Sequence, residues 1–306
     1  MKHLGKTAPF LGPGGTPLPG SIAEVEYLRL GGCDQWVMMR GENVANPPLV
    51  LLHGGPGMPE TLFFRRFNAP LEKIFTVIYW DQRGAGKSFN RAIPRSSMTV
   101  EQFLADLDEL ITVVQRRFGK DKIVLLGHSW GTVLGVLYAA RFPEKVSLYV
   151  GAAQIGDWPA ADVSSYAFAL GEAERLHNRK ALERLRAVGP PPYSARRVAT
   201  ERTWAQRLAG QLNAKSMWQA GRALTRGPEA SVFDLANVVR GFRFTLDAMW
   251  ADVSPLNLQV LAPALRMPVF FFLGRRDPWV RPETSVAYFE MLSAPSKNLV
   301  WFEQSG

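Results

Sequence analysis

The sequence predicts an α/β fold in which a mainly parallel sheet carries helices on both faces and receives one helical insertion. Short, continuously apolar runs alternate with segments whose apolar residues keep helical spacing, as in proteins whose strands are covered on both faces. Glycine-rich or polar sequence follows four of these runs, where the functional loops of a parallel sheet lie. The alternation breaks between residue 154 and about residue 262 and then resumes, which indicates an insertion.

The chain has 306 residues, enough for one large domain with an insertion. We divide it into a flexible leader (1–20), a core (21–153 and 263–306) and a helical cap (154–262). The leader is rich in glycine and proline and contains no apolar run of the length that a secretory signal needs. No segment has the apolar length of a membrane span. We therefore expect a cytoplasmic protein with no membrane partner.

The core is expected to begin with a hairpin-like pair of antiparallel strands. Residues 21–30 alternate between apolar and polar side chains, and residues 35–40 contain a second apolar stretch after a glycine-rich turn. Cys33 lies in this turn and is the only cysteine of the chain, so no internal disulfide is possible. It has no neighbouring histidine either, and we expect it to have a packing role.

Two buried strands are expected next. Residues 49–52 form a continuously apolar run that ends in His53-Gly54-Gly55-Pro56-Gly57. A short helix over residues 60–73 leads to the second run, residues 75–80. That run ends in Asp81-Gln82-Arg83-Gly84-Ala85-Gly86-Lys87-Ser88.

The third buried strand leads into a nucleophile elbow. Before it, Thr99 can cap a helix, with Gln102 as its capping-box partner. The apolar run at residues 124–126 then meets Gly127-His128-Ser129-Trp130-Gly131, and an apolar helical segment follows. In Gly-x-Ser-x-Gly the glycines leave room for a sharp strand-to-helix turn, and the helix N-terminus favours developing negative charge. We therefore predict that Ser129 is a catalytic nucleophile.

The alternation of strands and helices continues on either side of the insertion. A strand is expected over residues 146–153, and the helical cap follows, divided by Gly189-Pro190-Pro191-Pro192-Tyr193. Afterwards the pattern predicts a strand over 269–273, a helix over 282–292 and a last strand over 298–302.

A formal net charge of +9 raises the question of a nucleic-acid partner. The basic excess is concentrated in the cap between Arg175 and Arg226. No nucleic-acid motif accompanies it, and aromatic residues do not alternate with the basic ones as in a stacking groove. We interpret it as a solvated helical face and expect no nucleic-acid partner. The partner we expect is a small-molecule or short peptide substrate; the sequence assigns no oligomeric state.

Two further positions match what a serine hydrolase needs. The small residues after the first buried strand would let the amide of Gly55 face the site and form an oxyanion hole with the amide of Trp130. Asp277 follows the apolar strand over 269–273, where the acid of the triad belongs, since the order in this type of fold is serine, acid, histidine.

The polar residues beside these positions are expected to have structural roles. His53 should be a buried hydrogen-bonding residue beneath its loop, and His128 should point away from Ser129. Asp81 and Arg83 are expected to tie their own loop together.

Together, the sequences at residues 53–57, 81–88 and 127–131 resemble the proline iminopeptidase family of α/β-hydrolases, which are serine peptidases. The resemblance extends from about residue 21 to residue 306 and is weaker in the cap. It implies an α/β-hydrolase sheet with a helical cap and release of N-terminal residues, often proline, from peptides through an acyl-enzyme. It implies no metal and no organic cofactor.

The sequence departs from the family in the catalytic histidine. In the family this histidine follows the last strand in a Ser-Gly-His context, whereas the chain reads Gln304-Ser305-Gly306 there. His3 and His177 do not follow that strand. Loss of a triad member costs many orders of magnitude in rate, so we expect the histidine directly after Gly306.

A second departure concerns the substrate-binding residues. The family's amine-binding glutamates stand in cap motifs that pair tryptophan with glutamate. At the matching place this chain reads Trp204-Ala205-Gln206-Arg207-Leu208. The substrate-binding residues are therefore left unassigned. Four glutamates of the cap are other possibilities, none of which can be assigned: Glu172, Glu174, Glu201 and Glu229.

Three functions remain open from the sequence. The first is a serine hydrolase of the iminopeptidase type. The second is a carboxylesterase or amidase for small acyl substrates, favoured by the missing cap glutamate. The third is a non-catalytic hydrolase-fold protein that binds a ligand under its cap, supported by the missing histidine. An epoxide or haloalkane hydrolase is disfavoured, because those relatives carry aspartate where Ser129 stands.

Overall fold

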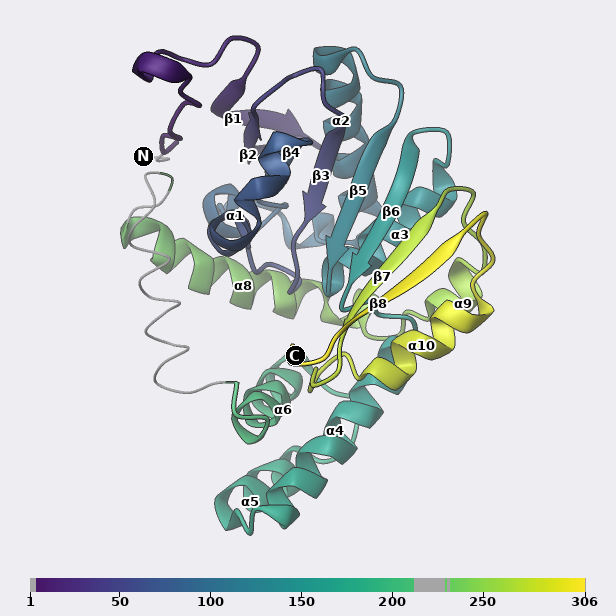
Figure 1. The fold of residues 1–306 in the computed structure, drawn as a ribbon. Helices are drawn as coiled ribbons and strands as arrows, with labels where there is room; N and C mark the ends of the chain where they lie inside the picture. Colours follow the sequence, from purple (N-terminus) through teal and green to yellow (C-terminus); the bar gives the residue numbers. More distant parts are fainter. Residues whose placement is uncertain (1–3, 212–228, 230–231, 306) are drawn as a thin grey trace.

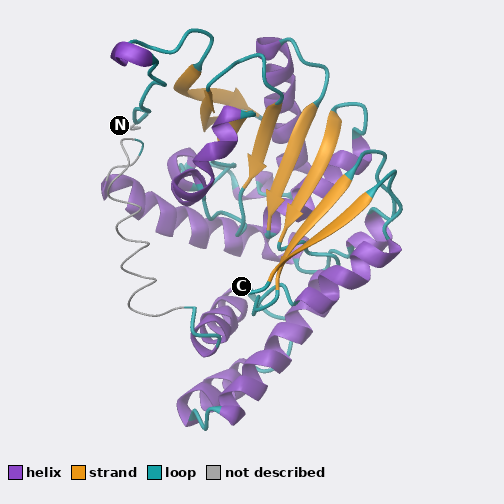
Figure 2. Ribbon diagram, in the orientation of Figure 1, coloured by secondary structure: helices purple, strands orange, loops and turns teal. Residues whose placement is uncertain are grey.

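A computed structural model describes residues 4–211, 229 and 232–305. Its centre is an eight-stranded sheet with helices against both faces, which confirms the predicted fold class (Figures 1 and 2). The strands are β1 (Ile22–Leu30), β2 (Cys33–Gly41), β3 (Pro48–Leu52), β4 (Thr76–Trp80), β5 (Ile123–His128), β6 (Val146–Ala152), β7 (Val269–Gly274) and β8 (Lys297–Phe302). The main helices are α1 (Thr61–Asn68), α2 (Val100–Phe118), α3 (Trp130–Arg141), α4 (Trp158–Arg175), α5 (Arg179–Val188), α6 (Ala195–Leu208), α8 (Val232–Val253), α9 (Leu258–Leu261) and α10 (Pro282–Met291).

The strands lie in the order β1-β2-β4-β3-β5-β6-β7-β8. β1 pairs with β2 in antiparallel register, with Leu30 opposite Cys33, so the predicted hairpin is confirmed. β2 is also antiparallel to β4, and every later pairing is parallel. The loops that follow the parallel strands therefore emerge at one edge of the sheet, where functional loops lie in folds of this type.

Apolar side chains of the central strands are buried on both faces of the sheet. In β3, for example, Val50 and Leu52 belong to a cluster with α2 and α3, while Leu49 and Leu51 belong to a second cluster on the face that α1 covers. Such two-sided burial is why these runs are apolar throughout instead of alternating.

Helix α2 begins as its sequence predicts, with one difference. The Thr99 hydroxyl accepts a hydrogen bond from the Gln102 amide at 3.2 Å, which satisfies one free donor of the first turn. The Gln102 side chain does not complete a capping box. It donates to Asp106 Oδ1 at 2.9 Å, because that buried carboxylate offers a stronger acceptor.

The described part of the insertion is helical. Helices α4, α5 and α6 pack together beyond one end of the sheet, whereas α8 runs along the core (Figure 1). Thr245 of α8 donates to the Gly84 carbonyl at 3.2 Å, which fastens α8 to the loop after β4. Arg226, one end of the basic stretch expected in the cap, lies outside the described residues.

The insertion leaves and re-enters the core at one place. Asp157 and Asn257 form an isolated antiparallel bridge, and Asn257 Nδ2 donates to Asp157 Oδ2 at 2.7 Å. We call this contact the 157–257 bridge. Within the described residues, no helix combines the length and the apolar character needed to cross a membrane.

Candidate active site

Ser129 lies between β5 and α3 in the geometry of a nucleophile elbow. Its backbone has φ 51° and ψ −118°, a strained conformation for a residue with a side chain. The flanking glycines are required by contact. A Cβ on Gly127 would lie 2.4 Å from the Gly131 carbonyl oxygen, and one on Gly131 would lie 2.0 Å from that of Leu52. The backbone of the elbow is thus in direct contact with the end of β3.

The glycine loop, residues 53–57, leaves β3 beside the elbow. Gly55 has φ 118°, and a Cβ there would lie 2.6 Å from the Gly57 nitrogen, so only glycine fits. Neither the Gly55 N–H nor the Trp130 N–H donates a hydrogen bond to any residue that the structure describes. These are the two amides predicted for an oxyanion hole, and both remain available to a ligand.

Gln82 joins the glycine loop, the elbow and the loop after β4, a role that the sequence did not reveal. Its backbone N–H donates to His53 Nε2, and its Nε2 donates to the His53 carbonyl, both at 3.1 Å. Its Oε1 accepts from Trp130 Nε1 at 3.0 Å. The side chain is fully buried, so these bonds hold the three segments in fixed relative positions.

His53 is the structural residue that the sequence predicts. It is buried, its Nδ1 lies 2.9 Å from the Gly54 carbonyl oxygen, and its Nε2 accepts from Gln82. Burial lowers the pKa of the imidazole, which favours the neutral form. With both nitrogens engaged, His53 has no free position for taking a proton from Ser129.

Asp277 lies in a turn after β7 and faces the same cavity as Ser129. Its Oδ1 accepts from the backbone N–H groups of Trp279 and Val280, each at 2.9 Å. Desolvation raises the pKa of this carboxyl above its ordinary value, and the two amides and the nearby His128 only partly offset that effect. The two amide hydrogen bonds hold the Asp277 side chain in place at the edge of the sheet where the parallel strands end.

The cavity between the core and the cap has a volume of about 520 Å³, in the range of ligand sites. The core lines it with the glycine loop, the elbow and the turn of Asp277. Helices α6 and α8 of the cap supply the opposite wall. The polar and charged residues that line the cavity are Glu60, His128, Ser129, Arg202, Thr203, Gln206, Gln211 and Asp277.

His128 does not point away from the site, and that prediction is wrong. It lines the cavity together with Ser129, and its Nδ1 lies 2.7 Å from Glu60 Oε1. The carboxylate of Glu60 draws the ring to this position. Burial lowers the pKa of His128, but Glu60 and the charge of Asp277 outweigh it and leave the pKa raised. The imidazole keeps 44% of its surface exposed.

The cap reaches the site through Arg202 of α6. The guanidinium lies over the rings of three tryptophans, at 5.5–5.8 Å from their centroids, and forms an ion pair with Asp162 at 3.5 Å. One of the three, Trp279, also donates from its indole to the Arg202 carbonyl at 2.9 Å. Helix α6 is thereby bound to the turn that carries Asp277. None of the cap glutamates considered above (Glu172, Glu174, Glu201 and Glu229) lines the cavity.

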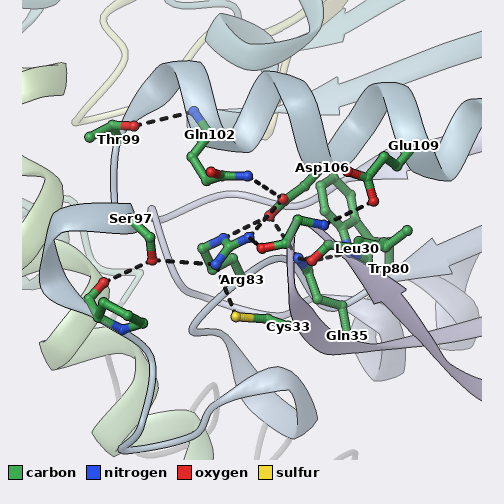
Figure 3. A network of polar contacts seen from close by, with 12 residues as sticks. Leu30, Cys33, Gln35, Trp80, Arg83, Ser97, Thr99, Gln102, Asp106 and Glu109 are labelled. Atoms are coloured by element: carbon green, nitrogen blue, oxygen red, sulfur yellow. Dashed lines mark hydrogen bonds and ion pairs between the residues drawn. The ribbon is translucent and has the colours of Figure 1, made fainter.

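Asp81 and Arg83, both in the loop after β4, have different roles. Asp81 ties its own loop together as predicted, since its Oδ2 accepts from the Lys87 amide at 2.9 Å. Arg83 does not. It forms a two-point ion pair with Asp106 of α2 at 2.8 Å and donates to Gly31 in the β1–β2 turn and to Cys33 at the start of β2 (Figure 3). Arg83 thus connects three separate elements. Cys33 is partly buried against the core, as its predicted packing role requires.

Comparison with known proteins places the chain in a family. Residues 47–306 match the model of the alpha/beta hydrolase fold family. The chain is an α/β-hydrolase. Its sequence is 31% identical over 297 residues to the probable aminopeptidase YbaC of Bacillus subtilis (strain 168), with 94% of this chain and 92% of that protein covered.

A second relative agrees with the predicted resemblance. The hydrolase is 30% identical over 235 residues to the proline iminopeptidase of Clostridioides difficile (strain 630), with 72% and 75% of the two chains covered. Among solved structures, a proline iminopeptidase-related protein of Thermus thermophilus is similar with a TM-score of 0.60 at 20% identity. This match covers 92% of the hydrolase and 89% of the Thermus chain and concerns the fold alone.

Proposed function

We propose that this α/β-hydrolase is a serine hydrolase of the aminopeptidase type, which releases N-terminal residues, often proline, from peptides through an acyl-enzyme. The observation that carries the proposal is the meeting of Ser129 and Asp277 in one cavity beside two backbone N–H groups without a partner in the described chain. The relatives named aminopeptidase and proline iminopeptidase support the same reaction type.

In the proposed mechanism, Ser129 Oγ attacks the carbonyl carbon while a base takes its proton. The negative charge that develops on the carbonyl oxygen is stabilised by the N–H groups of Gly55 and Trp130. The proton is then transferred to the leaving amine, and the carbon–nitrogen bond breaks to leave an acyl-enzyme. A water molecule, activated by the same base, hydrolyses the ester and restores Ser129.

We assign the base to a histidine directly after Gly306, oriented by Asp277. The chain that precedes this position supports the assignment: the Arg276 amide donates to the Ser305 carbonyl at 2.9 Å, one residue away from Asp277. His53 has no free nitrogen, and His128 is engaged by Glu60. Asp277 Oδ1 is held by two amides, which leaves Oδ2 to accept from an imidazole.

One observation favours a second candidate, a carboxylesterase or amidase for small acyl substrates. No glutamate or aspartate of the described part of the cap lines the cavity, so these described residues offer no carboxylate there for a substrate's N-terminal ammonium group. A comparison of turnover of proline-β-naphthylamide with turnover of p-nitrophenyl acetate separates the two candidates.

The nucleophile is tested by labelling with a fluorophosphonate probe, applied to the full gene-encoded chain. We expect labelling at Ser129, and we expect Ser129→Ala to abolish it and to lower kcat about 10⁶-fold. The matched control is Ser164→Ala, which removes a hydroxyl of α4 that donates to Glu283 outside the cavity and should leave labelling unchanged. If wild-type protein binds ligands under its cap but Ser129 stays unlabelled, the protein is a non-catalytic binding protein and the proposal fails.

A further inference from the structure

One oxygen of Glu60 connects the two segments that border Ser129. Glu60 Oε1 accepts from the Gly54 N–H at 3.0 Å and lies 2.7 Å from His128 Nδ1. Glu60 stands just before α1, 68 residues from His128 along the chain, and its side chain is only 18% exposed. The three groups form a compact contact in the wall of the cavity, which we call the Glu60 clamp.

The packing around Gly54 leaves no space for a side chain. A Cβ on Gly54 would lie 2.8 Å from Glu60 Oε1 and 3.3 Å from both His128 Nδ1 and Ser129 Cβ. A side chain at position 54 would therefore push the carboxylate away or displace the elbow. The glycine at this position is explained by the clamp, because its φ value alone does not demand glycine.

We propose that Glu60 is a positioning residue that sets the distance between the two amides of the oxyanion hole. Gly54 immediately precedes Gly55, and His128 lies two residues before Trp130, so the clamp holds a residue close to each donor. Oxyanion stabilisation depends on donors that are fixed before the reaction begins, and displacement by about 1 Å costs about 100-fold in rate. This inference rests on the proposed function, since it assigns a role within that same site.

The strength of the clamp depends on the charge of His128. The Nδ1–H donates to Glu60 in the neutral and in the protonated ring, but the bond is charge-assisted on both sides only when the ring is protonated. The titratable groups that face His128 are Glu60, Asp277 and the neutral His53. Since the two carboxylates raise the pKa of His128, the clamp is strong at low pH and weakens as pH rises through that raised pKa.

The kinetic test compares Glu60→Gln with Glu101→Gln, which removes the charge of an exposed glutamate paired with Arg141. With p-nitrophenyl acetate, which avoids the question of peptide specificity, we expect Glu60→Gln to lower kcat 10- to 100-fold, about what a misplaced donor costs. KM should change less than about twofold, because the lost interaction acts in the transition state. Glu101→Gln should change neither value. A loss confined to KM overturns the proposal.

A rescue variant separates positioning from simple structural damage. In His128→Asn the amide nitrogen can replace Nδ1 as the donor to Glu60, but it does not titrate. We expect kcat within about fivefold of wild type, roughly 1 kcal/mol of transition-state energy, and loss of the alkaline limb of the pH–rate profile that follows His128. His128→Leu, which cannot donate, should behave like Glu60→Gln. If both His128 variants retain full activity and the alkaline limb, the clamp has no positioning role.

A third measurement does not depend on turnover. In an NMR titration of the intact protein, the amide signals of Gly55 and Trp130 should shift with the same midpoint as the imidazole of His128. In Glu60→Gln that midpoint should move to lower pH, and the Gly55 signal should no longer follow it. If the amide signals of Gly55 and Trp130 in the wild type do not shift as His128 titrates, the inference is overturned. Absence of fluorophosphonate labelling contradicts the proposed function instead, so the two failures can be told apart.

Discussion

At the scale of single residues, close backbone contact decides which glycines are essential. Gly131, at the start of α3, lies so near β3 that a Cβ would stand 2.0 Å from the Leu52 oxygen and 3.0 Å from the His53 oxygen. We expect Gly131→Ala to destabilise the protein by about 3 kcal/mol or more, the range of severe overpacking. Urea unfolding followed by circular dichroism measures this.

Gly171 is the matched control, because it lies within α4 with no atom in contact range of an added Cβ. Gly171→Ala should stabilise the protein by about 0.5–1 kcal/mol through the higher helix propensity of alanine. Equal effects of the two substitutions would contradict the steric explanation.

Residues defined by a local pattern could be predicted from the sequence, and those defined by distant partners could not. Ser129, Gly55 and Asp277 each follow a recognisable apolar strand, so their meeting at one edge of the sheet follows from parallel pairing. The roles of Gln82 and Glu60 depend on partners 48 and 68 residues away, and no periodicity records such pairs. The incorrect expectation for His128 has the same origin, since its orientation follows from the contact with Glu60.

At the scale of elements, α4 and α6 enclose a carboxyl group that has too few hydrogen-bond partners. Glu201 is fully buried; its Oε1 accepts from the Ser165 hydroxyl at 2.8 Å, while its Oε2 has no hydrogen-bond partner in the described chain. Burial raises its pKa to about 7. The pKa of Asp162 beside it is also raised, to about 6, despite its ion pair with Arg202. The interface between these helices therefore favours protonated acids.

The pH dependence of stability follows from the sign of this shift. The folded state holds a proton on Glu201 up to about pH 7, whereas the unfolded chain releases it near the ordinary value of 4.5. Stability contributed by this group is therefore complete below pH 4.5 and is lost as pH rises towards 7, by on the order of 3 kcal/mol. Glu201→Gln, which replaces the acid by a neutral group of similar shape, should remove most of that loss.

Urea unfolding at pH 5 and pH 8 tests this expectation. Glu201→Gln should exceed wild type in stability at pH 8 and equal it or fall slightly below it at pH 5. Glu183→Gln, on the exposed side of α5, should match wild type at both values. If Glu201→Gln is equally destabilised at both pH values, ionisation of Glu201 is not what lowers the stability of the wild type at high pH.

At the scale of the whole molecule, apolar runs predicted which segments form strands, and glycine-rich turns predicted the antiparallel β1–β2 pair. The strand order was not predictable, because β3 lies between β4 and β5 and that placement depends on how helices pack across the sheet. The described part of the insertion is helical, in agreement with the loss of strand patterns there. Its contact with the core through Arg202 and Trp279 joins positions 77 residues apart and leaves no local pattern.

The 157–257 bridge makes a prediction at this scale. Asp157 caps α4 through Oδ1, which accepts from Ala160 N at 2.9 Å, and accepts from Asn257 through Oδ2. Asp157→Ala should therefore cost about 2 kcal/mol, roughly half for the cap and half for the bridge. Asn178→Ala removes only a helix cap, on α5, and should cost about 1 kcal/mol.

A double-mutant cycle with Asn257→Ala isolates the bridge. The two substitutions should be less than additive by about 1 kcal/mol, because either one already breaks the shared contact. Strict additivity in urea unfolding would mean that the two side chains stabilise the fold independently.

The same bridge has an evolutionary consequence. Since the chain departs from the sheet and returns to it at adjacent positions, the parallel pairing of β6 with β7 does not depend on the length of the segment between them. Each doubling of the length of this segment costs only about 0.6 kcal/mol, which is the additional entropy of closing a longer loop. The length of the segment between residues 157 and 257 can therefore change at little cost to the pairing of the sheet, so that the insertion and the sheet can vary separately.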